Sequence, residues 1–341
     1  MAKRITLKQI ANQFGVSIAT VSKALSDSYE ISTSTKDKIQ KYAKEHNYQS
    51  KSISLGLLNK KRKTIGVIIP NIMNSFFAKV FVGIEEKANQ HGYHLISCIS
   101  NESYEKEAKT MDLLKYGTLD GLIISLAEET QVKQNYAHLK NAISEGIPIV
   151  MFDRVSEEIE CDKVVVDDLE GAFHATNHLI KSGCKRVALI SVIDNLSVGK
   201  LRVEGYKKAL KHFNIPIEER LIVKISPKED FDTVLKIILS DKTIDGLLCL
   251  EESAAVNALS IVKKMPYKIP EDMSIVCFTN GKLLQHLTPS ISAISQHGKH
   301  IGETAASMLI DRIENEDQNK PYTTKVVKTS LIERESTKPI R

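Results

Sequence analysis

From Thr64 onward, short apolar runs alternate with longer segments of helical pattern, and this rhythm limits the possible folds more than any other feature. Eight runs have the length of buried strands: 65–69, 94–98, 121–125, 147–152, 163–166, 186–191, 246–250 and 274–278. Five segments between them have the length and apolar spacing of helices: 75–91, 104–117, 169–182, 200–213 and 253–264. Near-continuous Val, Ile and Leu runs separated by helices are typical of parallel strands buried on both faces. The rhythm therefore predicts doubly wound α/β structure, with ligand sites in loops beyond the carboxyl ends of the strands.

The first 48 residues have a different pattern, that of three short amphipathic helices. Thr6 can cap the first helix, with Gln9 at its third position and Gly15 at its end, while Ser17 and Ser32 can cap the next two. The side chains expected in their shared core are Leu7, Ile10, Ala11, Phe14, Val21, Ala24, Leu25, Ile39, Tyr42, Ala43 and His46. Three helices this short can bury only one small core, so we predict a separate all-α domain.

The charge distribution separates the same part of the chain from the rest. The 341 residues carry a net charge of +5, but residues 1–63 alone hold 13 Lys and Arg against 4 Asp and Glu. A basic head on a mildly acidic body indicates a polyanionic partner for the head alone. Residues 49–63 contain serines, Gly56 and a basic run at 60–63, and would form a poor helix in isolation. We predict a linker there that orders on a partner.

Membrane, secreted and disulfide-bonded proteins do not fit this composition. No window approaches the roughly 18 to 20 apolar residues of a membrane helix, and the start MAKRITLKQI has no apolar stretch of signal-peptide length. We therefore expect a cytoplasmic protein. Its cysteines are widely spaced and form no C-x-x-C pair, which indicates small buried side chains in a reducing compartment. They are Cys98, Cys161, Cys184, Cys249 and Cys277.

Polar residues that could suggest an enzyme are better explained by structural roles. His174 and His178 have the i, i+4 spacing of a zinc pair, but alanine stands where H-E-x-x-H has glutamate, so we expect solvated or capping side chains. Asp167-Asp168 lies at a strand-to-helix junction, where a helix cap is favoured over catalysis. Structural roles are also expected for His297 and His300 at the start of the last helix. With no phosphate-binding glycine motif and no activated nucleophile, we expect no catalysis, cofactor or metal.

The stretch GVSIATVSKAL, residues 15–25, is predicted to do more than close the small core. Val21 and Leu25 face that core, whereas Ile18, Ala19 and Lys23 lie off it near the helix start. A tight glycine turn connects this helix to the preceding one. In a helix-turn-helix, the N-terminal residues of the second helix meet base edges in the major groove, so we predict a recognition helix.

Taken together, these segments resemble the lactose/galactose repressor family of bacterial transcription regulators over nearly the whole chain. The resemblance is carried by TLKQIANQFGVSIATVSKAL, EISTSTKDKIQKYAKEHNY, TIGVIIPNIMNSFFAKVFVGIEEKANQHGYHL, DGLIIS, GIPIVMFDR, VVVDDLEGAFHATNHLIKSGCKRVALI, RVEGYKKAL, IPEDMSIVCF and LIERES. It implies a helix-turn-helix domain at 1–48, a hinge at 49–63 and an effector-binding and dimerisation core at 64–341. The core would be similar to periplasmic sugar-binding proteins. Its two subdomains would comprise about 64–162 with 293–323, and about 163–292 with 324–341.

The resemblance also implies which residues contact DNA. Ile18 and Ala19 would read bases through apolar contacts, and Lys23 would be the main hydrogen-bonding reader. The phosphate-contact candidates are Thr6, Ser17, Thr20 and Ser22. Leu57 falls where family members insert a leucine into the minor groove and kink the operator. Serines, Lys51 and Gly56 replace common hinge residues here, and we expect a looser hinge helix whose order depends more on DNA.

An effector pocket is implied between the two core subdomains. Arg202 matches an arginine that holds ligand oxygens, and Asp153 matches a ligand-contacting acid, although a structural salt bridge is an alternative for both. Phe76 and Phe77 match aromatics of the pocket wall. Two positions depart from the family: Glu251, in Glu251-Glu252 where Asn-Asp is usual, and Thr279, where aspartate is usual. They change the hydrogen-bonding groups of the pocket, so no specific sugar is implied.

The expected function is that of a homodimeric repressor of a carbohydrate catabolic operon, released by a small sugar-like effector. Its DNA partner would be a pseudo-palindromic double-stranded operator. A corepressor-dependent repressor or an activator of the same family stays open. A sugar-binding transport component is disfavoured by the basic head. Tetramers also stay open, although the final residues show no heptad extension for a coiled coil.

Overall fold

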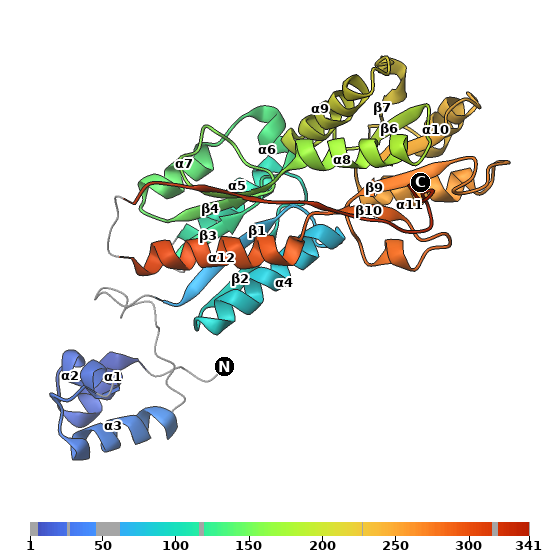
Figure 1. Cartoon of the computed structure of the whole chain (residues 1–341). Helices are drawn as coiled ribbons and strands as arrows, with labels where there is room; N and C mark the ends of the chain where they lie inside the picture. Colours follow the sequence, from blue (N-terminus) through green and yellow to red (C-terminus); the bar gives the residue numbers. More distant parts are fainter. Residues whose placement is uncertain are drawn as a thin grey trace. The chain divides into compact units, whose positions relative to one another are not determined.

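The computed structural model describes residues 6–25, 28–45, 62–115, 119–226, 228–315 and 320–340. The chain divides into two units, Met1–Lys60 and Lys61–Arg341, which are described separately (Figure 1). Among the described residues, no helix is both long enough and apolar enough to span a membrane. The five cysteines are free thiols, and all but the partly buried Cys98 are buried, as predicted.

The first unit contains α1 (Leu7–Phe14), α2 (Ile18–Leu25) and α3 (Thr33–Glu45). The predicted caps are confirmed: Thr6 Oγ1 accepts from the Gln9 amide at 3.3 Å, and Gln9 Oε1 accepts from the Thr6 amide at 2.8 Å. Ser17 Oγ accepts from the Thr20 amide at 3.0 Å. Gly15 ends α1 with φ of 63°, a left-handed conformation that favours glycine. The chain can therefore turn sharply from α1 into α2.

The three helices share one small core, as predicted. Its fully buried members are Ile10, Ala11, Val21, Ala24, Ile39 and Ala43, with Leu7, Phe14, Val16, Leu25, Ile31 and Tyr42 packed around them. Gln40 Nε2 donates to the Ala24 carbonyl at 3.0 Å and ties the end of α2 to α3. His46, also predicted in this core, lies outside the described residues. Packing on α1 and α3 therefore determines which face of α2 is left exposed.

The second unit begins with a six-stranded parallel sheet in the order β11-β5-β4-β3-β1-β2. Its strands are β1 (Thr64–Ile69), β2 (His94–Ile99), β3 (Gly121–Ile124), β4 (Ile149–Phe152), β5 (Asp162–Val166) and β11 (Thr324–Val327). Its helices are α4 (Ser75–Gln90), α5 (Tyr104–Lys115), α6 (Glu128–Lys133), α7 (Ala137–Ser144) and α12 (Gly298–Glu314). One face packs on α4 and α12, and the other on α5 and α7. We call this sheet with its helices the first subdomain.

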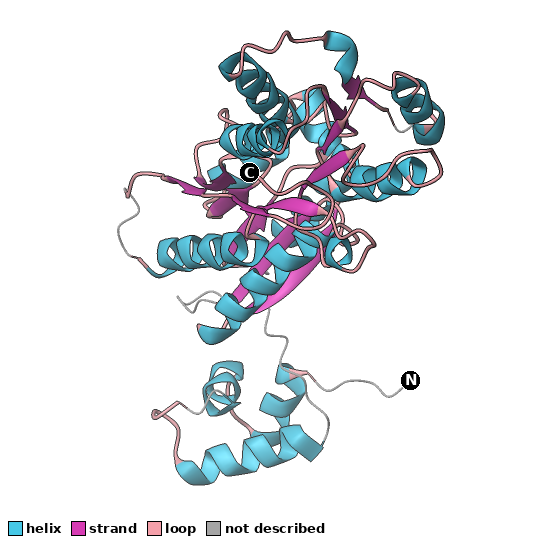
Figure 2. Cartoon of the chain, turned by 45° about the vertical axis from the view of Figure 1, so that its right-hand side comes forward, coloured by secondary structure: helices cyan, strands magenta, loops and turns pink. Residues whose placement is uncertain are grey.

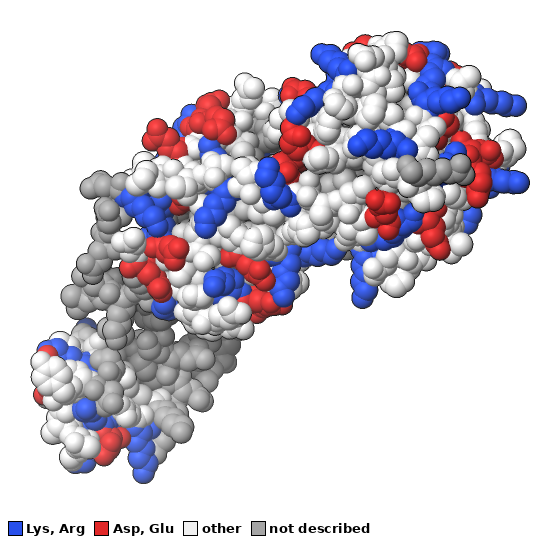
Figure 3. Space-filling model, viewed as in Figure 1, with Lys and Arg blue, Asp and Glu red and all other residues white. Residues whose placement is uncertain are grey.

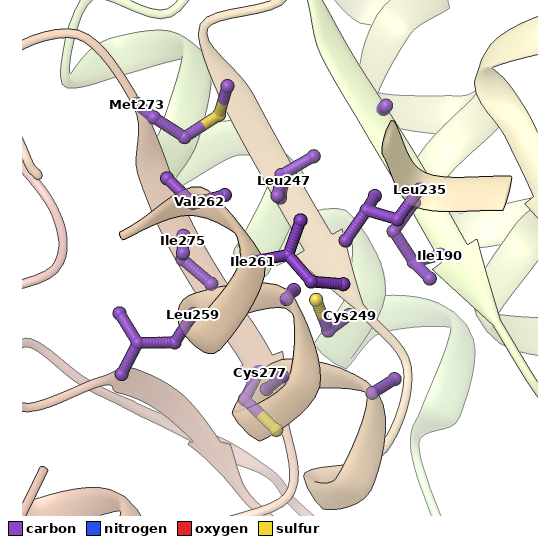
Figure 4. Packing of buried hydrophobic residues seen from close by; sticks show 14 of the residues in the cluster. Ile190, Leu235, Leu247, Cys249, Leu259, Ile261, Val262, Met273, Ile275 and Cys277 are labelled. Atoms are coloured by element: carbon purple, nitrogen blue, oxygen red, sulfur yellow. The ribbon is translucent and has the colours of Figure 1, made fainter. Parts of the chain in front are cut away.

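The second subdomain is built on another six-stranded sheet, in the order β12-β10-β9-β8-β6-β7. Its strands are β6 (Val187–Ser191), β7 (Ile222–Lys224), β8 (Gly246–Cys249), β9 (Ser274–Phe278), β10 (Ser292–Ser295) and β12 (Ser330–Ile332), with β12 antiparallel to β10. Its helices are α8 (Asp168–Lys181), α9 (Ser197–His212), α10 (Phe231–Leu239) and α11 (Glu252–Val262). Helices α8 and α9 cover one face, and α10 and α11 the other. Figure 2 shows the helices of the second unit arranged around its strands. Ile261 and Val262 at the end of α11 pack against Leu247 of β8 and against Ile275 and Cys277 of β9 (Figure 4).

All eight predicted strands and all five predicted helices are present. The strands β7, β10, β11 and β12 and the helices α6, α7 and α10 were missed. Strand β10 reads Ser-Ala-Ile-Ser with both serines buried, so it lacks an apolar run. Strands β7, β11 and β12 are short and lie at sheet edges, where burial on both faces is not required.

The chain crosses between the subdomains three times, after β5, β10 and β11. The subdomain boundaries expected from the sequence placed these crossings near residues 163, 293 and 324. In the structure, residues 163–166, 293–295 and 324–327 still belong to β5, β10 and β11, the strands that precede the crossings. Backbone pairing therefore moves each crossing a few residues downstream. The crossings are joined by hydrogen bonds, because Asp167 Oδ1 accepts from the Thr329 amide at 2.7 Å and His297 Nε2 lies 2.9 Å from Ser330 Oγ.

These contacts correct two predicted structural roles. Asp167 stands at the N-cap position of α8, but its carboxylate caps no helix amide and binds the third crossing instead. Asp168 also does not act as a cap, because it pairs with a buried arginine described below. His178 is buried with Nε2 3.0 Å from Thr337 Oγ1, so the predicted solvated or capping role is wrong for it, while His174 is exposed. Packing of the C-terminal segment on α8 explains this burial.

Helices α4 and α12 lie side by side and approach closely at glycines (Figure 1). A Cβ atom at Gly83 would lie 2.0 Å from the Lys299 carbonyl oxygen, and one at Gly302 would lie 2.0 Å from the Val80 carbonyl oxygen. No side chain fits at either position without separating the two backbones. The α4–α12 pair therefore depends on these glycines.

We expect Gly302→Ala to lower the free energy of unfolding. Alanine inside a helix is favoured over glycine by about 0.5–1 kcal/mol, but forcing atoms into this contact costs about 1–3 kcal/mol or more, so the clash should dominate. Chemical denaturation measures the change. The control is Ser307→Ala on the partly exposed side of α12, where we expect a change within about 0.5 kcal/mol. A Gly302→Ala protein as stable as the control would contradict this packing.

Candidate DNA-binding surface and effector site

Helix α2 has a buried side and an exposed side that match the two roles predicted for it. Val21 and Ala24 are fully buried, whereas Ile18 is 49% exposed, an unusual position for a large apolar side chain. Ser17, Ala19 and Lys23 are also exposed, and Thr20 and Ser22 are partly buried. The predicted base-reading side chains thus share an accessible side of one short helix.

The polar residues of this surface are already engaged within the domain. Lys23 Nζ forms an ion pair with Glu30, and both side chains are about half exposed. The Ser17 and Thr20 hydroxyls lie 2.9 Å apart, and Thr6 belongs to the capping box of α1. An exposed ion pair contributes only about 0–1 kcal/mol, so Lys23 could exchange Glu30 for a base at small cost. Leu57 lies outside the described residues.

In the second unit, basic and acidic side chains are mixed, unlike in the basic residues 1–63. On its face seen in Figure 3, basic and acidic side chains are interspersed, and no large field of one sign covers it. A polyanion gains binding energy from a concentrated basic surface rather than from alternating charges. Charge therefore gives no reason to place the polyanion partner on this face.

Four buried charged side chains gather where the two subdomains meet. Asp153 and Arg154 follow β4 of the first subdomain and are 6% and 7% exposed, while Asp168 of α8 and Arg202 of α9 are each 3% exposed. They lie beyond the carboxyl ends of parallel strands, where the fold was expected to place a ligand. We call these four residues the charge cluster.

Arg202 organises the second subdomain's half of the charge cluster. Its Nε donates to Asp168 Oδ1 at 2.8 Å, and its Nη1 donates to the Leu250 carbonyl at 2.8 Å. The guanidinium carbon lies 3.9 Å from the centre of the Phe278 ring, a cation–π distance. The salt-bridge alternative for Arg202 is thus realised with Asp168, a partner that the sequence interpretation missed. The position of Asp168 just beyond β5 was the available signal.

The other half of the charge cluster is incompletely hydrogen-bonded. Arg154 Nη1 donates to Glu102 Oε2 at 2.6 Å, and its guanidinium lies 5.3 Å from the Phe77 ring. Yet Arg154 Nε and Asp153 Oδ1 are buried with no hydrogen-bond partner among the described residues. A buried group left in this state costs about 1–3 kcal/mol, and more if it is charged. Asp153 also has φ of 57°, a strained conformation for a non-glycine residue of the kind found at functional sites.

Burial dominates the protonation of both aspartates in the charge cluster. It raises the pKa of Asp153 above its ordinary value, against the opposing effects of Arg154 and Arg202. It also raises the pKa of Asp168, which the adjacent Arg202 partly counteracts. Burial thus favours the neutral form of both carboxyl groups, and shifts of this kind are common at functional sites.

The remaining predicted effector residues are spread around the charge cluster. Phe76 and Phe77 lie edge to face, with centroids 5.3 Å apart, in the core of the first subdomain. Glu251 caps α11, because its Oε1 accepts from the Ala254 amide at 2.7 Å. Thr279 donates its hydroxyl to Gln296 Oε1 at 2.8 Å. Of this set, the structure brings Asp153 and Arg202 together, whereas Glu251 and Thr279 bind elsewhere.

Hydrogen bonds link the two subdomains at two further places. Ser75 of α4 hydrogen-bonds Glu252 of α11, and a Cβ at Gly281 would collide with the Glu252 carboxylate. In the second place, Gln131 Nε2 of α6 donates to Ser197 Oγ of α9 at 3.0 Å. The sequence interpretation named Glu251 as the pocket acid, but Glu252 is the one that reaches the opposite subdomain.

Similarity to known proteins identifies the chain. Residues 6–51 match the model for bacterial regulatory proteins of the lacI family, and residues 176–337 match a periplasmic binding protein-like domain. The chain is 30% identical over 338 residues to the HTH-type transcriptional regulator RegA of Clostridium saccharobutylicum, covering 97% of this chain and 99% of that protein. The chain belongs to the lacI family. It is a DNA-binding transcription regulator with a ligand-binding core, as predicted.

Other relatives of the regulator have names that concern sugars. It is 28% identical to the ribose operon repressor of Haemophilus influenzae over 335 residues, 97% of this chain and 98% of that protein. A LacI family transcriptional regulator from Enterococcus faecium, solved with bound ribose, superposes with a TM-score of 0.70 at 25% identity. That comparison covers 82% of this chain and 100% of the other. Family membership also sets aside the transport-component alternative.

The structure of the regulator predicts that Arg202→Met is strongly destabilising. The substitution leaves Asp168 as an uncompensated buried charge, which typically costs about 3–5 kcal/mol. Arg202 lowers the folded-state pKa of Asp168, so its removal raises that pKa further. The variant therefore gains more stability from protonation than the wild type, and the loss should shrink as the pH falls from 8 to 5. Chemical denaturation at several pH values measures this.

The matched control is Arg220→Met, which removes an exposed arginine that pairs with Glu218. We expect a change of at most about 1 kcal/mol from it. In the double variant Arg202→Met/Asp168→Asn, most of the lost stability should return, because no charge is left unpaired. A loss for Arg202→Met that does not depend on pH would show that the pair is not the cause.

Proposed function

We propose that the regulator represses a carbohydrate catabolic operon and releases its operator when a sugar-like effector binds between the core subdomains. The observation that carries this proposal is the charge cluster, where Asp153 Oδ1 is buried near Arg202 and has no hydrogen-bond partner in the part of the chain that the structure describes. The relatives that are named for a ribose operon or were solved with ribose support a sugar as the effector class. No catalytic step is assigned to the regulator.

In this proposal, residues 1–48 bind DNA in the cytoplasm and residues 49–63 form the hinge. Ile18, Ala19 and Lys23 meet base edges in the major groove, the first two through apolar contacts such as a thymine methyl group. Phosphate contacts come from Thr6, Ser17, Thr20 and Ser22, and Leu57 enters the minor groove at the operator centre. With a single hydrogen-bonding reader, each half-site discriminates modestly.

A homodimer follows from the shape of the operator. Two recognition helices related by a two-fold axis read a pseudo-palindrome, and the spacing of the half-sites then contributes to specificity. Val82 on α4 and Ile96 on the edge strand β2 are exposed apolar side chains of the first subdomain. We propose this region as part of the surface between the two copies.

Effector binding would act by favouring one arrangement of the subdomains. Asp153 and Arg154 come from one subdomain, and Asp168 and Arg202 from the other, so a ligand that contacts both favours their closed arrangement. The second candidate, a corepressor that promotes operator binding, needs the same contacts and differs only in which arrangement binds DNA. Operator release or retention on adding the ligand separates the two.

The test of DNA binding is its dependence on salt. Lys and Arg displace condensed counterions from DNA, so operator affinity should fall steeply and linearly on a log–log plot. Fluorescence anisotropy with operator fragments selected from random DNA measures the slope. Affinity that hardly changes between low and high salt would rule out binding through the basic head, and release on addition of a sugar tests repression.

Replacing Lys23 with alanine should relax base preference at one position in each half-site. The loss should be about 1–3 kcal/mol on the preferred base and smaller on others, since a base contact carries sequence information. Lys41→Ala, at an exposed position of α3, is the matched control and should leave base preference unchanged. Binding-site profiles of both variants measure this. If the profile of the Lys23 variant equals that of the wild type, another residue reads the base.

A further inference from the structure

A pocket on the second subdomain lies apart from the charge cluster and is lined by residues of α8 and of the edge strand β12. Its volume is about 310 Å³, at the lower end of the range known for small-molecule sites. None of the four residues of the charge cluster contributes to its lining. The side chains of Ile294, Leu331 and Ile340 form apolar parts of its wall. An apolar ligand group can therefore bury surface there.

His178 presents an unused hydrogen-bonding atom to this pocket. Its side chain is 1% exposed, and its Nδ1 has no hydrogen-bond partner among the described residues. The other ring nitrogen, Nε2, lies 3.0 Å from Thr337 Oγ1, and Thr337 does not line the pocket. Nδ1, in contrast, lies 3.9 Å from Oε1 of Glu333, which does line it. The unused nitrogen is therefore on the side of the ring that faces the pocket.

A chain of hydroxyl groups determines that this nitrogen is an acceptor. Ser292 Oγ donates its one proton to the Arg334 carbonyl at 3.2 Å, so it accepts at its 2.8 Å contact with Thr337 Oγ1. Thr337 thus donates to Ser292 and accepts from His178 Nε2. With its proton on Nε2, the neutral ring has a free lone pair on Nδ1. Burial lowers the pKa of His178 and favours this neutral form, against the opposing effect of Glu333.

The carboxylate of Glu333 is a second acceptor at the pocket. Its side chain is 56% exposed, and it accepts no hydrogen bond in the part of the chain that the structure describes. At 3.9 Å it is too far from His178 Nδ1 for a hydrogen bond, and neither atom carries a proton. Lys181 also lines the pocket, but it is exposed, so solvent screens its charge. Two neighbouring acceptors therefore lack a donor.

These two acceptors determine which ligand groups fit between them. A primary ammonium carries three protons, so it can donate to both acceptors at once, and Glu333 balances its charge. A hydroxyl group carries one proton and can serve only one of the two. A carboxylate or phosphate brings no proton and places a second negative charge beside Glu333. The pocket therefore favours amines over alcohols and acids of the same shape.

We propose that this pocket binds a small primary amine, whose ammonium donates to His178 Nδ1 and Glu333 and whose apolar body packs on Ile294 and Leu331. The regulator then has a second ligand site, which does not depend on the proposed effector site. Because its contacts come from α8, β10 and the segment after β12, the amine holds these elements together. Asp168, which supports the charge cluster, stands at the other end of the same helix α8.

The experiment compares probes of matched shape on the full-length regulator. The probes are benzylamine with benzyl alcohol and benzoate, and isoamylamine with isoamyl alcohol and isovalerate. Calorimetry gives Kd, and thermal shift gives the rise in melting temperature with probe concentration. We expect at least one amine to bind, and its alcohol and acid counterparts to bind about tenfold more weakly or worse, since each lacks a charge-assisted hydrogen bond.

Substitutions of the two acceptors test the position of the amine. Glu333→Gln removes the charge of an exposed side chain, so it should weaken amine binding about tenfold and leave the melting temperature of the free protein unchanged. His178→Gln retains an N–H group for Thr337 but lacks the ring acceptor, and it should also weaken the amine. Glu204→Gln, at an exposed position of α9, is the matched control and should leave Kd unchanged.

Each outcome supports or overturns the inference. Amine binding that Glu333→Gln weakens, with the melting temperature and the control unchanged, supports it. Binding of neither amine overturns it, and so does equal or tighter binding of the matched alcohol or acid. Amine binding that neither Glu333→Gln nor His178→Gln weakens would place the amine elsewhere on the regulator, and the inference would then also be wrong.

Discussion

The buried ion pair between Arg202 and Asp168 is the interaction on which the arrangement of the core depends. It joins α9 to α8, and through Leu250 and Phe278 it reaches the ends of β8 and β9. One turn further along α9, the Tyr206 hydroxyl donates to the Val187 carbonyl at 2.7 Å and fixes the helix against β6. Burying charges is expensive, and a well-packed apolar pair would often be as stable. The pair makes physical sense as a rigid support that keeps a guanidinium beside the opposite subdomain.

The same cost explains how ligand binding can be coupled to subdomain movement. Asp153 Oδ1 is buried without a hydrogen-bond partner among the described residues, so this arrangement of the subdomains carries an unfavourable term that a ligand could remove. The crossings, joined through Asp167–Thr329 and His297–Ser330, hold the subdomains together whatever the state of the cleft. The Ser75–Glu252 and Gln131–Ser197 hydrogen bonds also join the subdomains, and in the proposed mechanism they would break when the subdomains separate. A ligand that binds one arrangement more tightly than the other then shifts their populations by as much as its affinities differ.

Sequence patterns predicted those parts of the fold that depend on burial along a single segment. The eight predicted strands have apolar runs, although β2 lies at a sheet edge and is largely exposed, and the caps of α1 and α2 depend on neighbours three residues away. Features created by distant neighbours were missed: β10 contains buried serines, and His178 is buried only because the C-terminal segment covers it. The same holds for the site. Arg202 was found by resemblance, but its partner lies 34 positions away at the start of another helix, and proximity alone determines that pairing.

In the DNA-binding unit, burial of a few side chains also determines which side chains are left to bind a partner. Helix α2 has eight residues, and burying Val21 and Ala24 leaves only a narrow strip for recognition. On that strip Ile18 is about half exposed, so its side chain is accessible for the apolar base contact proposed for it. The two apolar side chains and one lysine that we propose as base readers would distinguish few sequences. In the proposed dimer, specificity would then depend on the distance between two such helices, and a change in the core that alters this distance would weaken operator binding.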